Sequence, residues 1–134
     1  MKEDCLFCKI VNKEMNAKII YEDDIVMAFL DAYPDVSGHT LIVPKKHYDD
    51  YTTIPDEVLA HINKIAKEIG PMLMEKFNKD GLALMVNYGS RQVIKHFHLH
   101  LLAGYCKNHK DDVIPKDEAY NIIKGIKWKK SIRS

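Results

Sequence analysis

Short apolar runs separated by polar turns organise most of this chain. Each run is bounded by turn-forming or charged residues, as is typical of strands. Five runs predict strands, at residues 18–24, 25–31, 40–44, 82–87 and 95–103. Residues 32–39 contain Pro, Asp, Ser and Gly and are expected to form a loop.

A helical period follows the third predicted strand, over residues 53–70. Apolar residues recur there three and four positions apart and form one apolar face. Thr53 is the expected N-cap. Gly70 and Pro71 are expected to kink or break the helix before it continues over residues 72–77. One helix between five strands favours an α+β fold, with an antiparallel sheet of about five strands and one main helix.

Composition narrows the class of protein. The chain has 134 residues, which suits one domain, and its net charge of +1 makes nucleic acid an unlikely partner. No apolar stretch approaches the length of about 20 residues that spans a bilayer, so no membrane partner is expected. Three cysteines, an odd number, argue against a disulfide framework and for a reducing, cytoplasmic compartment.

Three histidines, His96, His98 and His100, alternate with apolar residues in the last predicted strand. A strand projects alternate side chains to opposite faces, so three imidazoles are expected to share one face. That face has three interpretations: a solvated sheet surface, a metal site, or a site for nucleophilic catalysis by neutral imidazole. A metal site would need a further convergent ligand.

The segment QVIKHFHLHLL, residues 92–102, resembles the signature of the histidine triad (HIT) family. SGHTLIVPKKH at residues 37–47, MVNYG at residues 85–89 and the segment 5–31 resemble further parts of its HINT-type branch. The resemblance covers about residues 5–102. It implies one HIT domain over residues 1–134, with 103–134 as a C-terminal extension, a HIT-like fold and a homodimer.

The resemblance also implies an activity. HIT proteins cleave at the α-phosphate of nucleotides through a nucleotidyl-histidine intermediate. A hydrolase of purine nucleoside phosphoramidates or dinucleoside polyphosphates, releasing AMP or GMP without a catalytic metal, is therefore expected. The catalytic residues implied are His98 as nucleophile, His100 on the phosphate, His39 in the histidine network, and His96. The nucleotide-binding residues implied are Asp31 on the ribose, Asn87 on the phosphate, Phe7, Ile10 and Phe29 around the base, and Gln92 and Val93.

Two positions depart from the family pattern. Val93 stands where many relatives carry a hydroxyl that assists the leaving group. The loop from Asn87 to His96 is shorter than in HINT-type members and carries Arg91 where glycine is usual. His100 stands where the transferase branch has glutamine, which favours hydrolysis. The leaving group stays open, as do two alternatives: a nucleotide-binding module with little turnover, and a metal-dependent hydrolase that uses the histidines as ligands.

The resemblance further implies a structural zinc site formed by Cys5, Cys8, His47 and His96. Cys106 and His109 are a rival pair of ligands that no family pattern supports. The basic residues from 124 onward are interpreted as a solvated terminus, with nucleic-acid binding as the less favoured alternative. We expect the C-terminal segment to modulate substrate choice.

Overall fold

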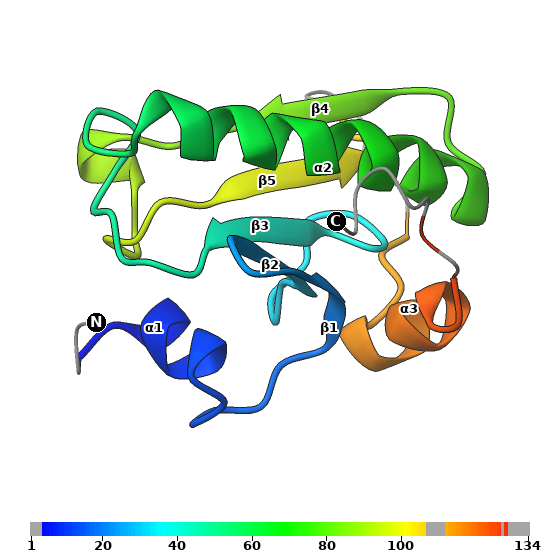
Figure 1. Ribbon diagram of the computed structural model, residues 1–134. Coiled ribbons are helices and arrows are strands. Elements are labelled where there is room, and N and C mark those ends of the chain that lie inside the picture. Colours follow the sequence, from blue (N-terminus) through cyan, green and yellow to red (C-terminus); the bar gives the residue numbers. More distant parts are fainter. Residues whose placement is uncertain (1–3, 107–111, 127, 129–134) are drawn as a thin grey trace.

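The computed structural model describes residues 4–106, 112–126 and 128 (Figure 1). Among these residues one antiparallel sheet contains strands in the order β1-β2-β3-β5-β4. The strands are β1 (Ile19–Glu22), β2 (Val26–Leu30), β3 (Thr40–Pro44), β4 (Leu82–Met85) and β5 (Leu99–Ala103). The predicted fold class is confirmed.

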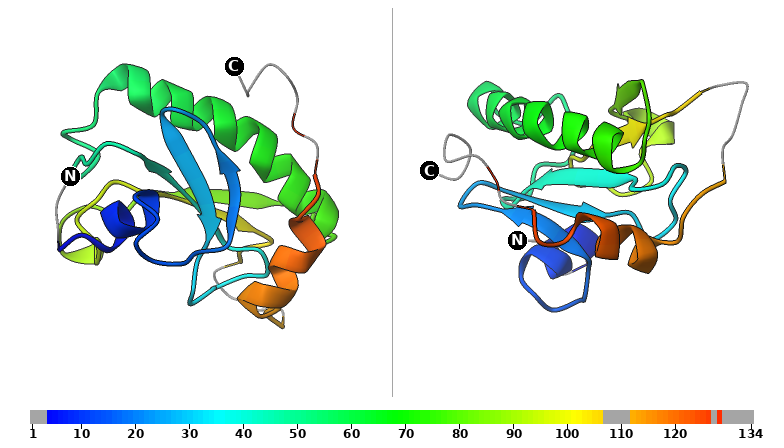
Figure 2. Two further views of the ribbon diagram at one scale, coloured as in Figure 1. Left: turned by 60° about the horizontal axis from the view of Figure 1, so that its bottom comes forward. Right: turned by 90° about the vertical axis from the view of Figure 1, so that its right-hand side faces the viewer.

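Helices of different length cover the two faces of this sheet. The long helix α2 (Asp56–Lys76) covers one face, and the short helix α1 (Leu6–Val11) lies under the other (Figure 1). A third helix, α3 (Lys116–Ile123), lies beyond β1 on the side opposite β4, as Figure 1 and the right-hand view of Figure 2 show. The sequence pattern did not predict α1 or α3. Within the described residues, none of the helices combines the length and the apolar character that crossing a bilayer requires.

Both faces of the central strands are buried. Along β2, Val26, Ala28 and Leu30 join the apolar cluster under α2. The alternate residues Met27 and Phe29 join a second cluster with residues of α1. A central strand of this kind shows no alternation of apolar and polar residues, because neither face meets water.

The helix α2 differs from its prediction at both places where proline occurs. Its N-cap is Pro55, not Thr53, whose hydroxyl instead bonds the backbone of Asp50. Of the predicted kink or break, the break is wrong, because Pro71 lies inside one continuous helix. A proline removes one backbone hydrogen bond, but burial of the neighbouring residues Ile69 and Leu73 against the sheet offsets that loss.

The last strand begins later than predicted, at Leu99 rather than Lys95. Its partner β3 ends at Pro44, which has no N–H for a ladder. The N–H of Phe97 donates instead to the carbonyl of Tyr48 at 2.7 Å. The segment that carries His96 therefore packs on the loop after β3 and leaves the sheet.

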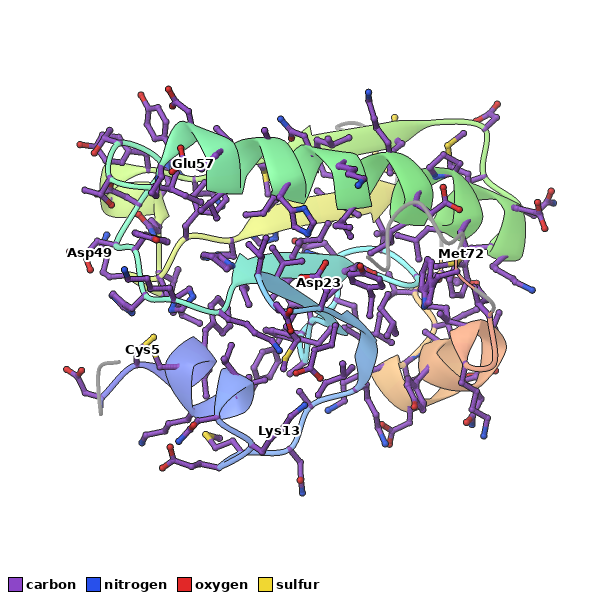
Figure 3. The ribbon with its side chains drawn as sticks, in the orientation of Figure 1. Cys5, Lys13, Asp23, Asp49, Glu57 and Met72 are labelled. Atoms are coloured by element: carbon purple, nitrogen blue, oxygen red, sulfur yellow. The ribbon has the colours of Figure 1, made fainter. Side chains whose placement is uncertain are left out.

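Asp23, labelled in Figure 3, fastens the β1–β2 turn to α2. Its carboxylate accepts hydrogen bonds from the Tyr21 hydroxyl at 2.8 Å and from the backbone N–H groups of Ile25 and Val26. His61 of α2 lies 2.7 Å from the same carboxylate. Burial opposes ionisation of Asp23, but these hydrogen bonds outweigh it and hold its pKa below the usual range.

Candidate active site

His98 precedes β5, and its ring lies against α1. Its Nδ1 lies 2.8 Å from the carbonyl oxygen of His96, and its ring meets Phe7 edge-on, with 5.0 Å between ring centroids. A carbonyl oxygen can only accept a hydrogen bond, so Nδ1 of His98 carries the proton and donates it. The other nitrogen, Nε2, therefore keeps its lone pair, which is the form a nucleophile needs.

His100 receives the opposite tautomer through His39. The backbone N–H of Asp35 donates to Nδ1 of His39 at 3.1 Å, so the proton of neutral His39 sits on Nε2. That Nε2 lies 2.9 Å from Nδ1 of His100 and donates to it, with the Asp31 carboxylate 3.5 Å away. Nε2 of His100 then carries a proton, and it is a buried atom without a partner among the described residues.

The histidines of the triad are buried and neutral near pH 7. His96, His98 and His100 are 0%, 8% and 9% exposed, which overturns the interpretation as a solvated sheet face. Burial lowers the pKa of His98 and His39, and burial together with neighbouring imidazoles lowers the pKa of His100 to about 4. The site thus holds an unprotonated nitrogen and an N–H donor side by side.

A cavity of about 330 Å³ opens beside His98 and His100. Part of its lining is apolar and consists of Phe7 and Ile10 of α1, Phe29 of β2 and Leu41 of β3. Asn87, Arg91 and Val93, from the loop after β4, line it as well. The cavity therefore combines an apolar surface with polar and charged groups, and His98 and His100 belong to the same lining.

The structure brings most of the predicted nucleotide-binding residues to this cavity. Phe7, Ile10, Phe29, Asp31, Asn87 and Val93 line it. Gln92 does not: its side chain is buried and donates to the carbonyl oxygens of Asp49 and Ile94, at 2.6 and 3.0 Å. Gln92 therefore holds the loop in place and is not presented to a ligand. His96 also turns away from the cavity.

Several lining residues were not predicted for the site. Leu41 could have been found from its place in a buried strand beside His100, its partner across β3 and β5. Lys116 had no sequence signal, because it lies in α3, outside the segment that resembles the family. Arg91 was noted only as a departure from the family pattern, and it lines the cavity.

Cys5, Cys8, His47 and His96 form a separate cluster behind the cavity, with their ligand atoms all within 4.8 Å of one another. Sγ of Cys8 lies 3.2 Å from Nδ1 of His47 and 3.5 Å from Nδ1 of His96. Sγ of Cys5 lies 3.4 Å from the same nitrogen of His96. Cys5, labelled in Figure 3, enters the cluster from the start of α1.

The hydrogen bonds of this cluster leave the right nitrogens free for a metal. Nε2 of His96 donates to the carbonyl of Pro44 at 2.9 Å, and Nε2 of His47 lies 2.8 Å from the Asp49 carboxylate. Each Nδ1 therefore keeps its lone pair and faces two thiols, a donor set that suits tetrahedral zinc. Burial lowers the pKa of His96 to about 4, consistent with a neutral ligand.

A second group of possible metal ligands consists of Asp31, His39 and His100. Unlike those of the first group, its hydrogen bonds leave no free ring nitrogen on His39. Nδ1 of His39 accepts an N–H and its Nε2 carries the proton, so a metal on Nε2 would require an imidazolate. The hydrogen bonds therefore favour a proton-bonded network over the metal-dependent alternative. Of the rival pair, Cys106 is exposed, and His109 lies outside the described residues, as do most of the basic residues from 124 onward.

Comparison with known proteins places this site in a family. Residues 12–107 match the model of the HIT domain. The chain belongs to the HIT family. It is 43% identical, over 103 residues, to a HIT-like protein of Methanocaldococcus jannaschii, and the match covers 75% of this chain and 79% of that protein. It is also 36% identical over 104 residues to a protein of Arabidopsis thaliana named adenylylsulfatase HINT3, covering 76% of this chain and 53% of the relative.

A solved structure shares both fold and size with this HIT protein. It is a zinc-bound histidine triad family protein of Mycobacterium smegmatis, 30% identical, with a TM-score of 0.79, and the match covers 90% of each chain. The architecture is thus that of the family's nucleotide-binding hydrolases.

Proposed function

We propose that this HIT protein hydrolyses purine nucleotides at the α-phosphate through a covalent nucleotidyl-histidine on His98. One observation carries the proposal: the bond from Nδ1 of His98 to the carbonyl of His96 leaves Nε2 as a lone pair beside the partnerless N–H of His100. A nucleophile and a donor for a phosphate oxygen therefore share one cavity.

The chemistry needs two displacements. Nε2 of His98 forms a bond to phosphorus, while the bond to the leaving group breaks and the leaving atom keeps the electron pair. A water molecule then attacks the same phosphorus, the phosphorus–nitrogen bond breaks, and the water loses a proton as the nucleoside monophosphate departs. Both steps place charge on the phosphate oxygens, where the N–H of His100 donates.

The remaining lining residues suit a nucleoside. Phe7, Ile10 and Phe29 form an apolar slot on which a base can pack, and the rings of Phe7 and Phe29 meet edge-on at 5.4 Å. Asp31 follows β2 and lines the same cavity, where its carboxylate can accept from both ribose hydroxyls. A purine nucleoside with an α-phosphate is common to adenosine and guanosine phosphoramidates, purine dinucleoside polyphosphates and adenylyl sulfate.

The test is release of AMP from adenosine 5′-phosphoramidate and from diadenosine tetraphosphate by the wild type and by His98→Ala, with EDTA present. The expected result is turnover that survives EDTA and falls by about 1,000-fold or more in the variant. Rapid quenching of the wild type should show AMP bound to the peptide that contains His98. A variant that keeps its rate would overturn the nucleophile.

Two alternatives give different results in the same assay. A binding module would bind AMP, but its turnover would be negligible in the wild type as well as in His98→Ala. A metal-dependent hydrolase would lose its chemical step in EDTA, and a thermal melt in EDTA shows whether that loss is only unfolding.

We also propose a structural zinc in the cluster of Cys5, Cys8, His47 and His96. Zinc there would link α1 to the segment that supplies the carbonyl of His96. Support comes from the orientation of both Nδ1 atoms toward the thiols, and a zinc-bound structural relative agrees with it.

Two further expectations stay proposals. A homodimer is supported by the edge strand β4 and the residues after it, where Leu84, Val86 and Tyr88 are exposed. Light scattering on the wild type and on Leu84→Glu tests it, since the charge should shift the molecule to a monomer. A cytoplasmic location is supported by the free thiols of Cys5, Cys8 and Cys106.

A further inference from the structure

The loop that carries Arg91 is held in place from behind. A short 3₁₀ turn, η1 (Gly89–Arg91), precedes Gln92, whose buried amide donates to two backbone carbonyls. The Lys95 ammonium donates to the carbonyl oxygens of Gly89 and Gln92, both at 2.8 Å. These bonds fasten the backbone on both sides of Arg91, so its position at the cavity is built into the fold.

Arg91 itself is left without a partner. Its guanidinium forms no hydrogen bond or ion pair with any residue that the structure describes, yet it lines the cavity beside His98. The other charged residues of that lining are Asp31 and Lys116. Arg91 is an exposed residue at the cavity wall, and a guanidinium that pairs with no carboxylate there can bind an anion, because it presents several N–H donors in one plane.

Arg91 lines the cavity together with the histidines, in the loop that leads from Asn87 to His98. It comes from a different part of the chain than Phe29 and Leu41 of the apolar slot, which lie on β2 and β3. A nucleoside in the slot with its α-phosphate at His98 sends its next group away from the slot, and we place that group beside this loop. Lys116 lies at the nucleoside end, because its neighbour Asp117 pairs with Lys18, whose carbonyl accepts from Leu30.

We infer that Arg91 selects nucleotides whose leaving group is an anion, such as a polyphosphate or a sulfate, over those whose leaving group is a neutral amine. This inference rests on the proposed function. When the bond from phosphorus to the leaving oxygen breaks, that oxygen keeps the electron pair and gains negative charge. A guanidinium beside it stabilises this charge in the transition state. A neutral amine needs a proton instead, which arginine does not supply.

The experiment compares two substrates that share adenosine and the α-phosphate, namely adenylyl sulfate and adenosine 5′-phosphoramidate. The readout is the ratio of their kcat/KM values. Arg91→Gln should lower this ratio by roughly 10- to 100-fold, since it removes a charge-assisted contact to one leaving group only. Arg91→Lys should restore part of the ratio. An unchanged ratio in Arg91→Gln would overturn the inference.

Two lysine variants serve as matched controls. Lys116→Ala removes one positive charge from the other end of the same cavity, so both substrates should change by the same factor and the ratio should hold. Lys67→Ala removes an exposed charge on α2, outside the cavity, and should leave both rates as in the wild type. If Lys116→Ala lowers the ratio as much as Arg91→Gln, the effect is the overall charge of the cavity and the inference fails.

A binding experiment separates this inference from the proposed function. In the His98→Ala background, which makes no covalent intermediate, the affinities for ATP and AMP are measured with and without Arg91→Gln. Arg91→Gln should weaken the affinity for ATP at least about 10-fold more than the affinity for AMP, because the β- and γ-phosphates occupy the leaving-group end. This readout stands even if the wild type turns over neither substrate. Equal weakening, or none, would contradict the role of Arg91.

Discussion

Nδ1 of His98 lies 2.8 Å from the carbonyl oxygen of His96, so one histidine of the motif orients the next through its backbone. The side chain of His96 meanwhile turns to the Cys5–Cys8 cluster. His96 therefore connects the two groups, because its ring belongs to the Cys5–Cys8 cluster and its carbonyl accepts from the ring of His98. Several measurable consequences come from this arrangement and from the histidine network beside it.

Replacing His39 should lower kcat without preventing nucleotide binding. His39→Ala removes the donor to Nδ1 of His100, so His100 no longer favours the tautomer with a proton on Nε2. We expect kcat to fall by about 10- to 100-fold, because a donor to the phosphate oxygens is lost part of the time. Steady-state kinetics on the phosphoramidate measures it. His61→Asn, on α2 and outside the cavity, is the control and should keep kcat.

Removing a thiol from the cluster should remove the metal and lower stability. Cys8→Ser should reduce bound zinc from about one per chain to near zero and lower Tm by roughly 10 °C, because metal binding contributes to folding. Elemental analysis and a thermal melt give the two numbers. Cys106→Ser, which changes an exposed thiol outside the cluster, should alter neither. Zinc retained in full by Cys8→Ser would sink the ligand assignment.

The histidine network should make the protein sensitive to acid. The pKa of His100 is about 4 in the folded state, mainly because it is buried, against about 6.5 in an unfolded chain. Between these values only the unfolded state binds the proton. The free energy of unfolding should therefore fall by about 2–3 kcal/mol as the pH drops from 6.5 to 4. Urea titrations across this range test it, and His100→Asn should show a shallower dependence on pH.

A side chain at Gly70 should lower stability. A Cβ at this position would lie 2.5 Å from Cδ2 of Leu82, where α2 packs on β4. Gly70→Ala should lower the free energy of unfolding by about 1–3 kcal/mol, despite the better helix propensity of alanine. Gly81→Ala is the matched control, since nothing lies within 4 Å of its Cβ. Equal stability of the two variants in chemical denaturation would show that Leu82 moves aside without cost.

The sequence by itself determined the strands, the long helix and the histidines of the site. Short apolar runs and a 3.6-residue period are local patterns, so they predict elements such as β3 and α2 without knowledge of the fold. The alternation of His98 and His100 with Leu99 and Leu101 likewise predicts two faces, and the structure confirms it by placing the leucines under α2.

Only the tertiary structure decided the rest. The tautomers of His98 and His100 depend on a carbonyl and on the N–H of Asp35, and a sequence does not say which backbone groups face a ring. Gln92 lies outside the cavity lining and Lys116 belongs to it, because the positions of the loop and of α3 depend on long-range contacts. Pro71 stayed inside α2 because burial against the sheet outweighs a local preference. Local patterns report what one segment favours alone, whereas these outcomes depend on groups distant in sequence.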